Sequence, residues 1–464
     1  MRLALARLVA RFARGLSHVV GRTGGTTVPG RMLLRISPGA LAGLSRRLDE
    51  GSVLVSATNG KTTTSAMISA CLAEEGRPVV HNRAGSNMAW GVGTALLDAG
   101  AREGQLGLFE VDEAWLPRVA EQVDPKLILL SNLFRDQLDR YGELELLADR
   151  WEGVMDANEG RSRFVLCADD PLVADLGRER EGVTYFGLDD DSQALPALQH
   201  AADSKHCRNC GHPYVYDAVY LGHLGRWHCP NCGRARPQLG VVARRVKLEG
   251  MSGSQITLAA PTGEISVRLP LPGLYNVYNA LAAAATALEL GVGMENVRVA
   301  LEGFGAAFGR VETIPVPTGG ASDAGHRAVR DLSILLVKNP AGANEVLRTL
   351  ALEEGELDLW LALNDNIADG RDVSWVWDAD FELLAGRVRR VTCSGTRAEE
   401  MALRLKYAGV DAEPAVDRDL ERSLEAAVAN GDGGRPLFAL PTYTAMLEIR
   451  DLLARRGLAR RWSE

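Results

Sequence analysis

The segment with the clearest chemical meaning is a lysine-threonine turn within residues 51–70, GSVLVSATNGKTTTSAMISA. It reads as a short apolar strand, a turn at Gly60 and then a helix. Backbone N–H groups at a helix start carry partial positive charge and attract anions such as phosphates. Gly60 lets the backbone approach the anion, Lys61 can reach terminal phosphates and Thr62 offers a hydroxyl to Mg²⁺. The pattern predicts a nucleotide-phosphate loop, although Val55 stands where the full pattern has a glycine.

Four cysteines make a second chemical pattern, two Cys-x-x-Cys pairs that each precede a glycine. Such pairs at this spacing are typical of tetrahedral Zn²⁺, and four thiolates leave no open position for water. We therefore expect a structural Zn²⁺ site, with a redox dithiol pair as the weaker alternative. The expected ligands are Cys207, Cys210, Cys229 and Cys232. We interpret the nearby histidines as flanking surface residues: His206, His212, His223 and His228.

Carboxylates and amides follow several apolar runs. Glu110 ends the run LGLFEVDE, with Asp112 and Glu113 beside it, and near a phosphate turn it could hold Mg²⁺ directly or through water. A solvated acidic strand end is the alternative. Two further segments supply polar side chains to the same edge, namely Asn132, Arg135, Asp136, Gln137 and Asp139 from SNLFRDQLDRYGE, and Asn82, Gly85 and Asn87 from HNRAGSNMAWG.

The elements that must position these residues alternate between strand-like and helix-like segments over residues 45–190. Continuous apolar strands separated by helices predict a parallel sheet covered on both faces. Ligands of such sheets bind beyond the carboxyl ends of the strands, where the polar residues lie. The expected strands are SVLVS, RPVVHN, LGLFEVDE, KLILLSN and RFVLCADD, and the expected helices span 63–75 and 87–99.

We divide the chain into four parts. Residues 1–44 form a basic N-terminal segment, and residues 45–312 form an α/β nucleotide-binding domain that carries the cysteine-rich insert at 203–236. The stretch 313–330 is rich in Pro and Gly and is interpreted as a linker. Residues 331–464 resume the alternation of strands and helices and predict a smaller, Rossmann-like α/β domain.

Composition excludes several classes of protein. The 464 residues are 46% hydrophobic and 24% charged, as in globular proteins. A net charge of −8 argues against a nucleic-acid-binding surface. No run approaches the roughly 20 apolar residues that span a bilayer. Cys71, Cys167 and Cys393 stand singly in apolar surroundings and are expected in the core, which fits a reducing, cytoplasmic location.

Residues 1–22 are rich in arginine, contain no acidic residue and place their apolar residues near helical spacing. They predict a basic amphipathic helix, and the arginines interrupt any apolar core that a secretory signal would need. We favour packing of this helix against the protein itself or a partner. Peripheral contact with the inner face of an anionic membrane is the alternative.

The motifs together resemble the ATP-dependent Mur ligase family, which joins amino acids to cell-wall precursors. ATNGKTTT is similar to the family's GTNGKT nucleotide loop, with Ala57 in place of a glycine. Glu110 matches the Mg²⁺-binding glutamate, and SNLFRDQLDRYGE resembles the TNI…DHLD…HG segment, with Gln137 where a histidine is usual. The resemblance covers most of the chain and implies ATP and Mg²⁺ as cofactors. The implied nucleotide-loop residues are Thr58, Asn59, Gly60, Lys61, Thr62 and Thr63.

Two further matches lie later in the chain. LYNVYNALAA resembles the family's HN-x-x-N-A-x-A-A helix start, which implies that Asn279 lies near the adenine. FGRVE resembles the family's GR-x-E element, which implies that Arg310 lies near the nucleotide.

Three departures single out one branch of the family. The DYAHNP stretch of ordinary members reads LLVKNPAG here, which keeps Asn339 and Pro340 but loses the aspartate and the histidine. Ordinary members have no four-cysteine insert. The residues before the nucleotide loop are too few for the usual UDP-sugar-binding domain, so we expect another form of the substrate. Together with LNDNIADGRDVSWVWDADFE, SGTRAEEMALRLKYAG and LPTYTAML, these features resemble the ligase-like subunit of enzymes that amidate lipid II.

That resemblance implies a reaction and a partner. ATP would activate the α-carboxylate of D-glutamate in the lipid II stem peptide as an acyl phosphate, and ammonia would then give D-isoglutamine. The ammonia would come from a class-I glutamine amidotransferase of the GatD type, in a heterodimer. The chain itself shows no cysteine-centred glutaminase signature.

In this branch an aspartate of the ligase-like subunit is thought to complete the partner's Cys-His dyad by orienting the imidazole. The resemblance assigns this role to Asp372, the second aspartate of DGRD. Asp365 and Asp369 lie in the same loop and are the rival candidates. Without the resemblance, the loop reads as a solvated acidic turn.

Two other functions remain open at this point. A stand-alone ligase of the Mur tripeptide or folylpolyglutamate type would use an amino acid as nucleophile, and the altered DYAHNP stretch speaks against it. A non-catalytic zinc-ribbon scaffold with a decayed ATP site is the other alternative. Against it, Lys61, Thr62 and Glu110 are all intact.

Overall fold

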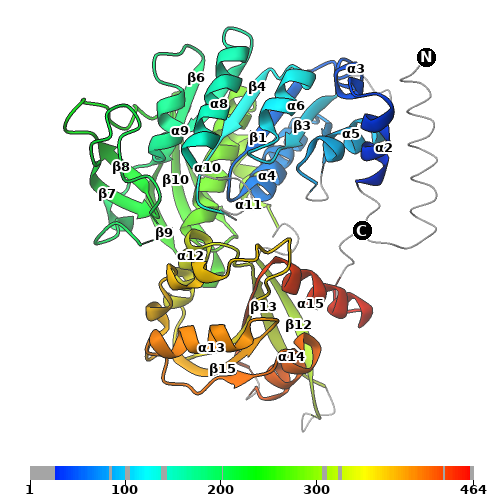
Figure 1. The fold of residues 1–464 in the computed structure, drawn as a ribbon, viewed down its shortest axis with the longest axis vertical. Helices are drawn as coiled ribbons and strands as arrows, with labels where there is room; N and C mark the ends of the chain where they lie inside the picture. The colour runs from blue at the N-terminus through cyan, green and yellow to red at the C-terminus, as the bar shows by residue number, and fades with distance from the viewer. Residues whose placement is uncertain are drawn as a thin grey trace.

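The computed structural model describes residues 27–82, 86–99, 105–136, 144–200, 202–305, 311–321, 327–431 and 434–459. Within this part of the chain, two α/β domains lie one above the other in Figure 1, each built around its own sheet. The upper domain holds the nucleotide-type loop and the cysteine-rich insert. The chain enters the second sheet at Val311.

The first sheet contains nine strands among the described residues, in the order β11-β10-β9-β6-β5-β4-β1-β3-β2. The strands from β2 to β9 pair in parallel, and β9, β10 and β11 form an antiparallel edge. The expected parallel sheet is therefore confirmed. The strands are β1 (Ser52–Ser56), β2 (Val79–His81), β3 (Leu106–Glu110), β4 (Leu127–Leu130), β5 (Arg163–Cys167), β6 (Val183–Leu188), β9 (Val241–Leu248), β10 (Ser254–Ala260) and β11 (Gly263–Leu269).

Helices cover this sheet. The alanine-rich helix α10 (Leu274–Glu289) packs against α4 (Lys61–Glu74) and against β5, β6 and β9. Its alanines from 280 to 287 are fully buried, because small side chains let the helix approach the sheet closely. The other helices of this domain are α2 (Val28–Ile36), α3 (Ala40–Ser45), α5 (Ala89–Asp98), α6 (Leu116–Val123), α8 (Leu144–Asn158), α9 (Pro171–Leu176) and α11 (Met294–Glu302).

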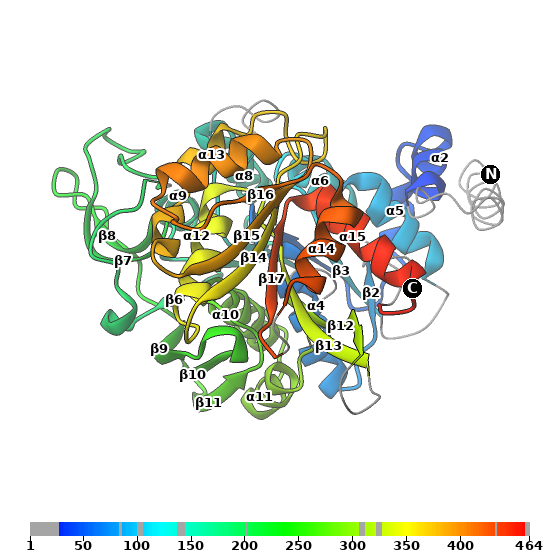
Figure 2. The same ribbon diagram turned by 90° about the horizontal axis from the view of Figure 1, so that it is seen from below.

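The second sheet has the order β12-β13-β17-β14-β15-β16, parallel except for the β12–β13 pair. Helices α12 and α13 cover one face, and α14 and α15 cover the other (Figure 2). The elements are β12 (Val311–Ala321), β13 (Arg327–Leu335), α12 (Pro340–Ala351), β14 (Leu357–Ala362), β15 (Val388–Ser394), α13 (Ala398–Tyr407), β16 (Ala415–Val416), α14 (Leu420–Ala429), β17 (Leu437–Pro441) and α15 (Tyr443–Arg455).

The interpretation of residues 313–330 as a linker is wrong. Most of this stretch belongs to the antiparallel strands β12 and β13 of the second sheet. The linker interpretation is based on the proline and glycine content of this stretch, which includes Pro315 and Pro317. Proline has no backbone N–H to donate to a neighbouring strand, so it is unfavourable in a central strand. Here β12 is the outermost strand and pairs only with β13, and an edge strand tolerates proline.

The cysteine-rich insert contains a separate antiparallel hairpin of β7 (Val215–Leu221) and β8 (Leu224–His228). This hairpin lies beyond the β6–β9 part of the first sheet, at the left of the upper domain in Figure 1. Cys71, Cys167 and Cys393 are fully buried, as expected of core residues.

The basic N-terminal helix expected at residues 1–22 lies outside the described residues. In the part of the chain that the structure does describe, no helix combines the length and hydropathy needed to cross a bilayer.

A buried charge cluster ties β13 to the rest of the second sheet. The Arg330 guanidinium is 2% exposed, pairs with the Asp358 carboxylate and donates to the carbonyl oxygen of Ala427 at 2.7 Å. Arg389 donates to the other oxygen of Asp358 at 2.9 Å. Burial alone would raise the pKa of Asp358, but the two guanidinium groups hold it below its usual range.

We expect Asp358→Ala to lower the free energy of unfolding of this domain by about 3 kcal/mol, because Arg330 would then be a buried charge without its counter-ion. Urea denaturation followed by circular dichroism measures the change. Asp451→Ala removes an exposed ion pair with Arg455 in the same domain and should change the free energy by less than about 0.5 kcal/mol. Equal effects of the two substitutions would contradict this assignment.

Candidate functional site

The predicted nucleotide loop connects β1 to α4 at the carboxyl edge of the first sheet. Gly60 precedes the helix with φ = +87°, in the left-handed region that favours glycine. A Cβ atom at Gly60 would lie 1.9 Å from Oδ1 of Asn279 on α10. Asn279 also accepts a hydrogen bond from the Thr64 hydroxyl at 3.2 Å. The loop therefore needs glycine at this position for two reasons, its backbone conformation and the close approach of Asn279.

Ala57 does not need to be glycine. Among the described residues it is absent from those with positive φ, so its backbone is open to any residue. Its side chain is 1% exposed and its carbonyl oxygen accepts a hydrogen bond from the Lys61 ammonium. Alanine in place of the family's glycine therefore introduces no backbone strain at this position.

The Lys61 ammonium is buried among carboxylates. Its Nζ lies 2.9 Å from Oε2 of Glu113, and both residues are 7% exposed. Burial by itself lowers the pKa of Lys61, but the charges of Glu113, Asp112 and Glu110 outweigh it and hold the pKa above its usual range. Lys61 therefore carries a positive charge at neutral pH.

The pKa of Glu113 is also shifted by its partner, in the opposite direction to that of Lys61. Burial raises the pKa of its carboxyl group, but Lys61 and the more distant Lys338 outweigh burial and keep the pKa below its usual range. Shifted pKa values of this kind cluster at functional sites. Sequence reasoning named Glu113 only as a neighbour of Glu110.

Glu110 lies at the tip of β3 and accepts a hydrogen bond from the Thr62 hydroxyl at 2.9 Å. The Asn82 side chain holds this strand end on both sides, since it accepts from the Glu110 N–H at 2.9 Å and donates to its carbonyl oxygen at 2.8 Å. A hydroxyl and a carboxylate side by side are the oxygen ligands that Mg²⁺ prefers. The pair therefore fits a Mg²⁺ site.

The loop after β4 forms hydrogen bonds with the other side of the nucleotide loop. The Asn132 side chain accepts from the Asn59 N–H at 2.9 Å and donates to the Asn59 carbonyl oxygen at 3.1 Å. The Thr58 hydroxyl accepts from the Phe134 N–H at 3.0 Å. The sequence-based placement of Asn132 at this edge is confirmed.

The second domain reaches into the same site. Lys338 donates to the Thr58 carbonyl oxygen at 3.1 Å and forms an ion pair with Asp136 at 2.6 Å. The Asn339 side chain caps α12 by accepting from the Gly342 N–H at 2.9 Å, and it donates to Oδ1 of Asn59 at 3.0 Å. Sequence reasoning missed Lys338, although it stands where ordinary Mur ligases have the histidine of DYAHNP.

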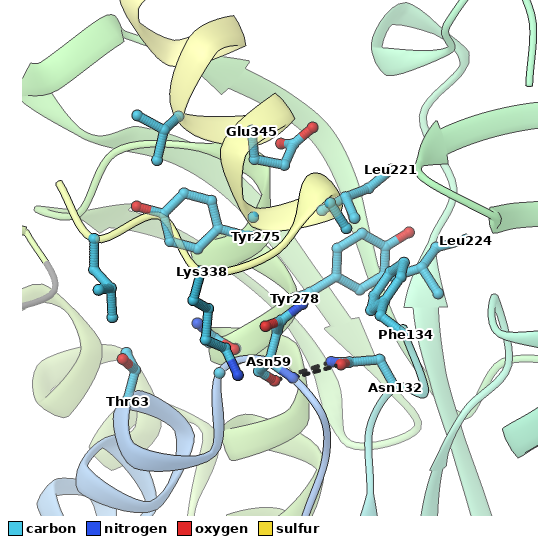
Figure 3. Close-up of a pocket in the computed structure, with 16 residues that line it drawn as sticks. Asn59, Thr63, Asn132, Phe134, Leu221, Leu224, Tyr275, Tyr278, Lys338 and Glu345 are labelled. Atoms are coloured by element: carbon cyan, nitrogen blue, oxygen red, sulfur yellow. Dashed lines mark hydrogen bonds between the residues drawn. The ribbon is translucent and has the colours of Figure 1, made fainter. Parts of the chain in front are cut away.

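These elements enclose a pocket, shown in Figure 3. Asn59, Gly60, Thr63 and Asn279 line one side, and residues of α12 and of the loop before it line another. An apolar wall completes the pocket, formed by Phe134, Leu221, Leu224, Tyr275 and Tyr278. Leu221 and Leu224 belong to the insert hairpin, which sequence reasoning had treated as a separate excursion.

Several residues named from the sequence are not described in the structure. Arg310, Gly85, Gln137 and Asp139 lie outside the described residues. Arg135 is described, and it forms an ion pair with Asp203 at the start of the insert and a longer one with Asp378. It therefore joins the central domain to the insert and to the second domain.

The four cysteines of the insert converge. Their sulfur atoms all lie within 4.8 Å of one another, with Cys207 to Cys232 at 3.6 Å and Cys210 to Cys229 at 3.5 Å. A tetrahedral Zn²⁺ site with Zn–S bonds of about 2.3 Å has sulfur atoms about 3.8 Å apart. A hydrogen bond from the Arg234 backbone lowers the pKa of Cys232 to about 6, whereas burial raises the pKa of Cys229 to about 11, so the geometry of the four sulfur atoms and not their pKa values supports the site. The cluster fits Zn²⁺.

The histidines near this cluster differ in exposure. His206 and His212 are exposed, as expected, but the interpretation of His223 as a surface residue is wrong. His223 is fully buried at the hairpin turn, where its ring packs on Phe134 with centroids 4.6 Å apart. Its Nε2 lies 3.3 Å from Oδ2 of Asp170. A buried carboxylate partner lets an imidazole occupy the interior.

The three aspartates of the loop after β14 have different surroundings. Asp365 pairs with Arg397 at 2.8 Å, and Asp369 is buried and accepts from the Thr444 N–H at 2.7 Å. Asp372 is exposed, and its Oδ1 accepts from the Ser374 N–H at 2.8 Å. Its hydrogen bonds with Ser374 lower the pKa of Asp372, so it is a carboxylate at neutral pH.

We expect the purified chain to contain a single Zn²⁺ ion, and Cys210→Ser to lose it, because three thiolates hold the metal less tightly than four. Inductively coupled plasma mass spectrometry measures the metal, and limited proteolysis should then cut the insert. Cys393→Ala, at a buried cysteine of the second domain, should keep the metal. Full zinc content in the Cys210→Ser variant would contradict the assignment.

Two family models match this chain. The Mur ligase middle domain matches residues 55–223, and the MurT ligase C-terminal domain matches residues 336–446. Among solved structures, the fold is similar to a pseudomurein peptide ligase type C from Methanothermus fervidus, with a TM-score of 0.65 and 20% identity. That alignment covers 88% of this chain and 79% of the other.

Curated relatives match over nearly the full length. The subunit MurT of lipid II isoglutaminyl synthase (glutamine-hydrolyzing) from Staphylococcus aureus strain N315 is 32% identical over 98% of both chains. The subunit of the same name from Streptococcus pneumoniae strain R6 is 31% identical over 99% of both chains. This chain therefore belongs to the MurT family of Mur ligase-like proteins.

Proposed function

We propose that this chain is the ATP-using subunit of an enzyme that amidates lipid II in the cytoplasm, at the inner face of the membrane. The reaction converts the α-carboxylate of D-glutamate in the stem peptide to the amide of D-isoglutamine. The names of the curated relatives support the substrate. The observation that carries the chemistry is the convergence of Lys61, Thr62 and Glu110 with Lys338 of the second domain around one loop.

The chemistry of the reaction explains why such a site is needed. A carboxylate is a poor electrophile, and transfer of the ATP γ-phosphoryl group to one of its oxygens makes that oxygen a competent leaving group. Ammonia then attacks the carbonyl carbon, phosphate leaves with the oxygen, and the nitrogen loses a proton to give the amide. Bound Mg²⁺ supplies charge neutralisation at the phosphates.

The residues of this chain supply the rest. Gly60 and the N-terminus of α4 offer backbone N–H groups to phosphate oxygens, and Asn279, which lines the same pocket beside Gly60, would lie near the adenine. Lys61 would offset the negative charge that develops on the transferred phosphoryl group, and Thr62 and Glu110, which lie within hydrogen-bond distance of each other, would hold Mg²⁺. Lys338 adds a second positive charge at the domain boundary.

Glu113 keeps Lys61 in place before a nucleotide binds. Its carboxylate pairs with the ammonium at 2.9 Å and compensates its charge in the interior. Phosphate oxygens would compete with Glu113 for the same ammonium. In this proposal Glu113 therefore positions Lys61 and does not itself react.

The ammonia comes from a partner, a class-I glutamine amidotransferase of the GatD type that forms a heterodimer with this chain. The relatives are named as subunits of glutamine-hydrolyzing enzymes, which supports a partner of this kind. Asp372 would orient the histidine of the partner's Cys-His pair. Its exposure supports this role, whereas Asp365 and Asp369 are engaged by Arg397 and Thr444.

Lys61→Ala should lower the rate of amidation about 10²–10³-fold, because the transferred phosphoryl group loses its nearest positive charge. Mass spectrometry of the stem peptide measures the reaction through the one-dalton loss on amidation. Lys247→Ala removes an exposed lysine of β9 and should leave the rate unchanged. Normal amidation by the Lys61→Ala variant would exclude this mechanism.

Asp372→Asn should impair amidation with glutamine but spare amidation at high free ammonia, because the asparagine cannot stabilise the partner's imidazolium. The two rates are compared in the reconstituted heterodimer. Asp365→Asn is the matched control, since its carboxylate already pairs with Arg397 in the same loop. An equal fall with both nitrogen donors would assign Asp372 to the ligase site instead. Full activity of the chain without a partner would favour a stand-alone ligase.

A further inference from the structure

The insert hairpin has its cysteines at one end and its turn at the other. Cys207 and Cys210 precede β7, and Cys229 and Cys232 follow β8, so the four sulfur atoms close the open end of the hairpin. The turn at Gly222 and His223 lies at the opposite end. An isolated two-stranded hairpin is marginally stable in water, so a metal at the open end stabilises the whole element.

The turn is held between the two domains. Gly222 donates its N–H to Oε1 of Gln199 at 2.6 Å, and a Cβ atom at Gly222 would lie 2.7 Å from the Phe134 ring. Arg348 of α12 donates to the carbonyl oxygen of Tyr220 at 2.8 Å. Together with the burial of His223, these contacts place the turn at a defined position.

That position is beside the nucleotide loop. Leu221 and Leu224 flank the turn and line the same pocket as Asn59, Gly60 and Asn279 (Figure 3). Phe134 connects the two, since its ring packs on the hairpin turn and its N–H donates to the Thr58 hydroxyl. Leu221 and Leu224 are 5% and 2% exposed, and together with the Phe134 ring they line the apolar part of a pocket whose other side is the polar loop. Such a pocket suits a ligand with a flat apolar face and a charged end.

We propose that the turn of this hairpin forms the base-binding wall of the nucleotide site, with Leu221 and Leu224 packing against the base. Zn²⁺ at the far end of the hairpin then supports nucleotide affinity by holding the wall in place. The inference rests on the proposed function, because it takes a nucleotide as the ligand of this pocket. It assigns the insert a binding role in addition to its structural one.

The test measures binding of MgADP to the full-length, zinc-loaded chain by isothermal titration calorimetry. Leu221→Ala and Leu224→Ala should each weaken binding about tenfold, because each removes apolar contact with the base. Leu221→Met conserves volume and should bind within about twofold of the unchanged protein. Val215→Ala is the matched control, since Val215 lies on the same hairpin and is 44% exposed.

Removal of zinc tests whether the metal supports nucleotide affinity. Protein that has been stripped of zinc with a chelator and then freed of the chelator should bind MgADP at least about tenfold more weakly, and added Zn²⁺ should restore binding. Circular dichroism of the metal-free protein without nucleotide checks that the two sheets remain folded. Loss of affinity with the sheets intact supports the inference.

Two outcomes separate this inference from the proposed function. If the unchanged protein binds MgADP and both leucine variants and the metal-free protein bind it equally well, the hairpin is not part of the site. If the unchanged, zinc-loaded protein does not bind MgADP, the nucleotide assignment itself is wrong.

Discussion

The site depends on one electrostatic constraint, the buried positive charge of Lys61. An ammonium with 7% exposure is stable only where carboxylates compensate it, and Glu113 lies 2.9 Å away. Because β1 and β3 are parallel neighbours, the loop after β1 and the acidic tip of β3 meet at the same edge of the sheet. The resulting set of charges has a net negative excess near the loop, and Lys338 of the second domain offsets part of it.

Residues of both domains form the site. Asn59 of the loop and Asn339, the N-cap residue of α12, exchange hydrogen bonds across the boundary, and Lys338 contacts both Thr58 and Asp136. The insert adds a third contribution, since Tyr220 at the end of β7 accepts from Arg348. The residues that form this site therefore come from separate parts of the chain, and a ligand bound there would hold the domains together.

Local patterns were sufficient for the first five strands of the first sheet, β1 to β5, because continuous apolar runs such as those of β1 and β3 have few alternatives in a chain of this composition. They failed at β12, where prolines are tolerated only because the strand lies at the sheet edge. They also failed at His223, whose burial depends on Asp170 and Phe134, residues far away in the sequence. The position of a strand at a sheet edge and the burial of a side chain both depend on contacts with residues distant in the sequence, so a local pattern cannot predict them.

The sequence by itself determined the glycine-lysine-threonine turn between a strand and a helix, and the two Cys-x-x-Cys pairs, because each depends on residue type and short spacing. The meeting of Thr62 with Glu110 depends on the pairing of β1 with β3 in the sheet. Only the tertiary structure decided that Glu113 compensates Lys61, that Lys338 stands beside the loop, and that Asp372 is the exposed aspartate of its loop. It also brought Leu221 and Leu224 into the pocket. These contacts join segments separated by long stretches of chain, and their geometry follows from how the two sheets and the insert pack.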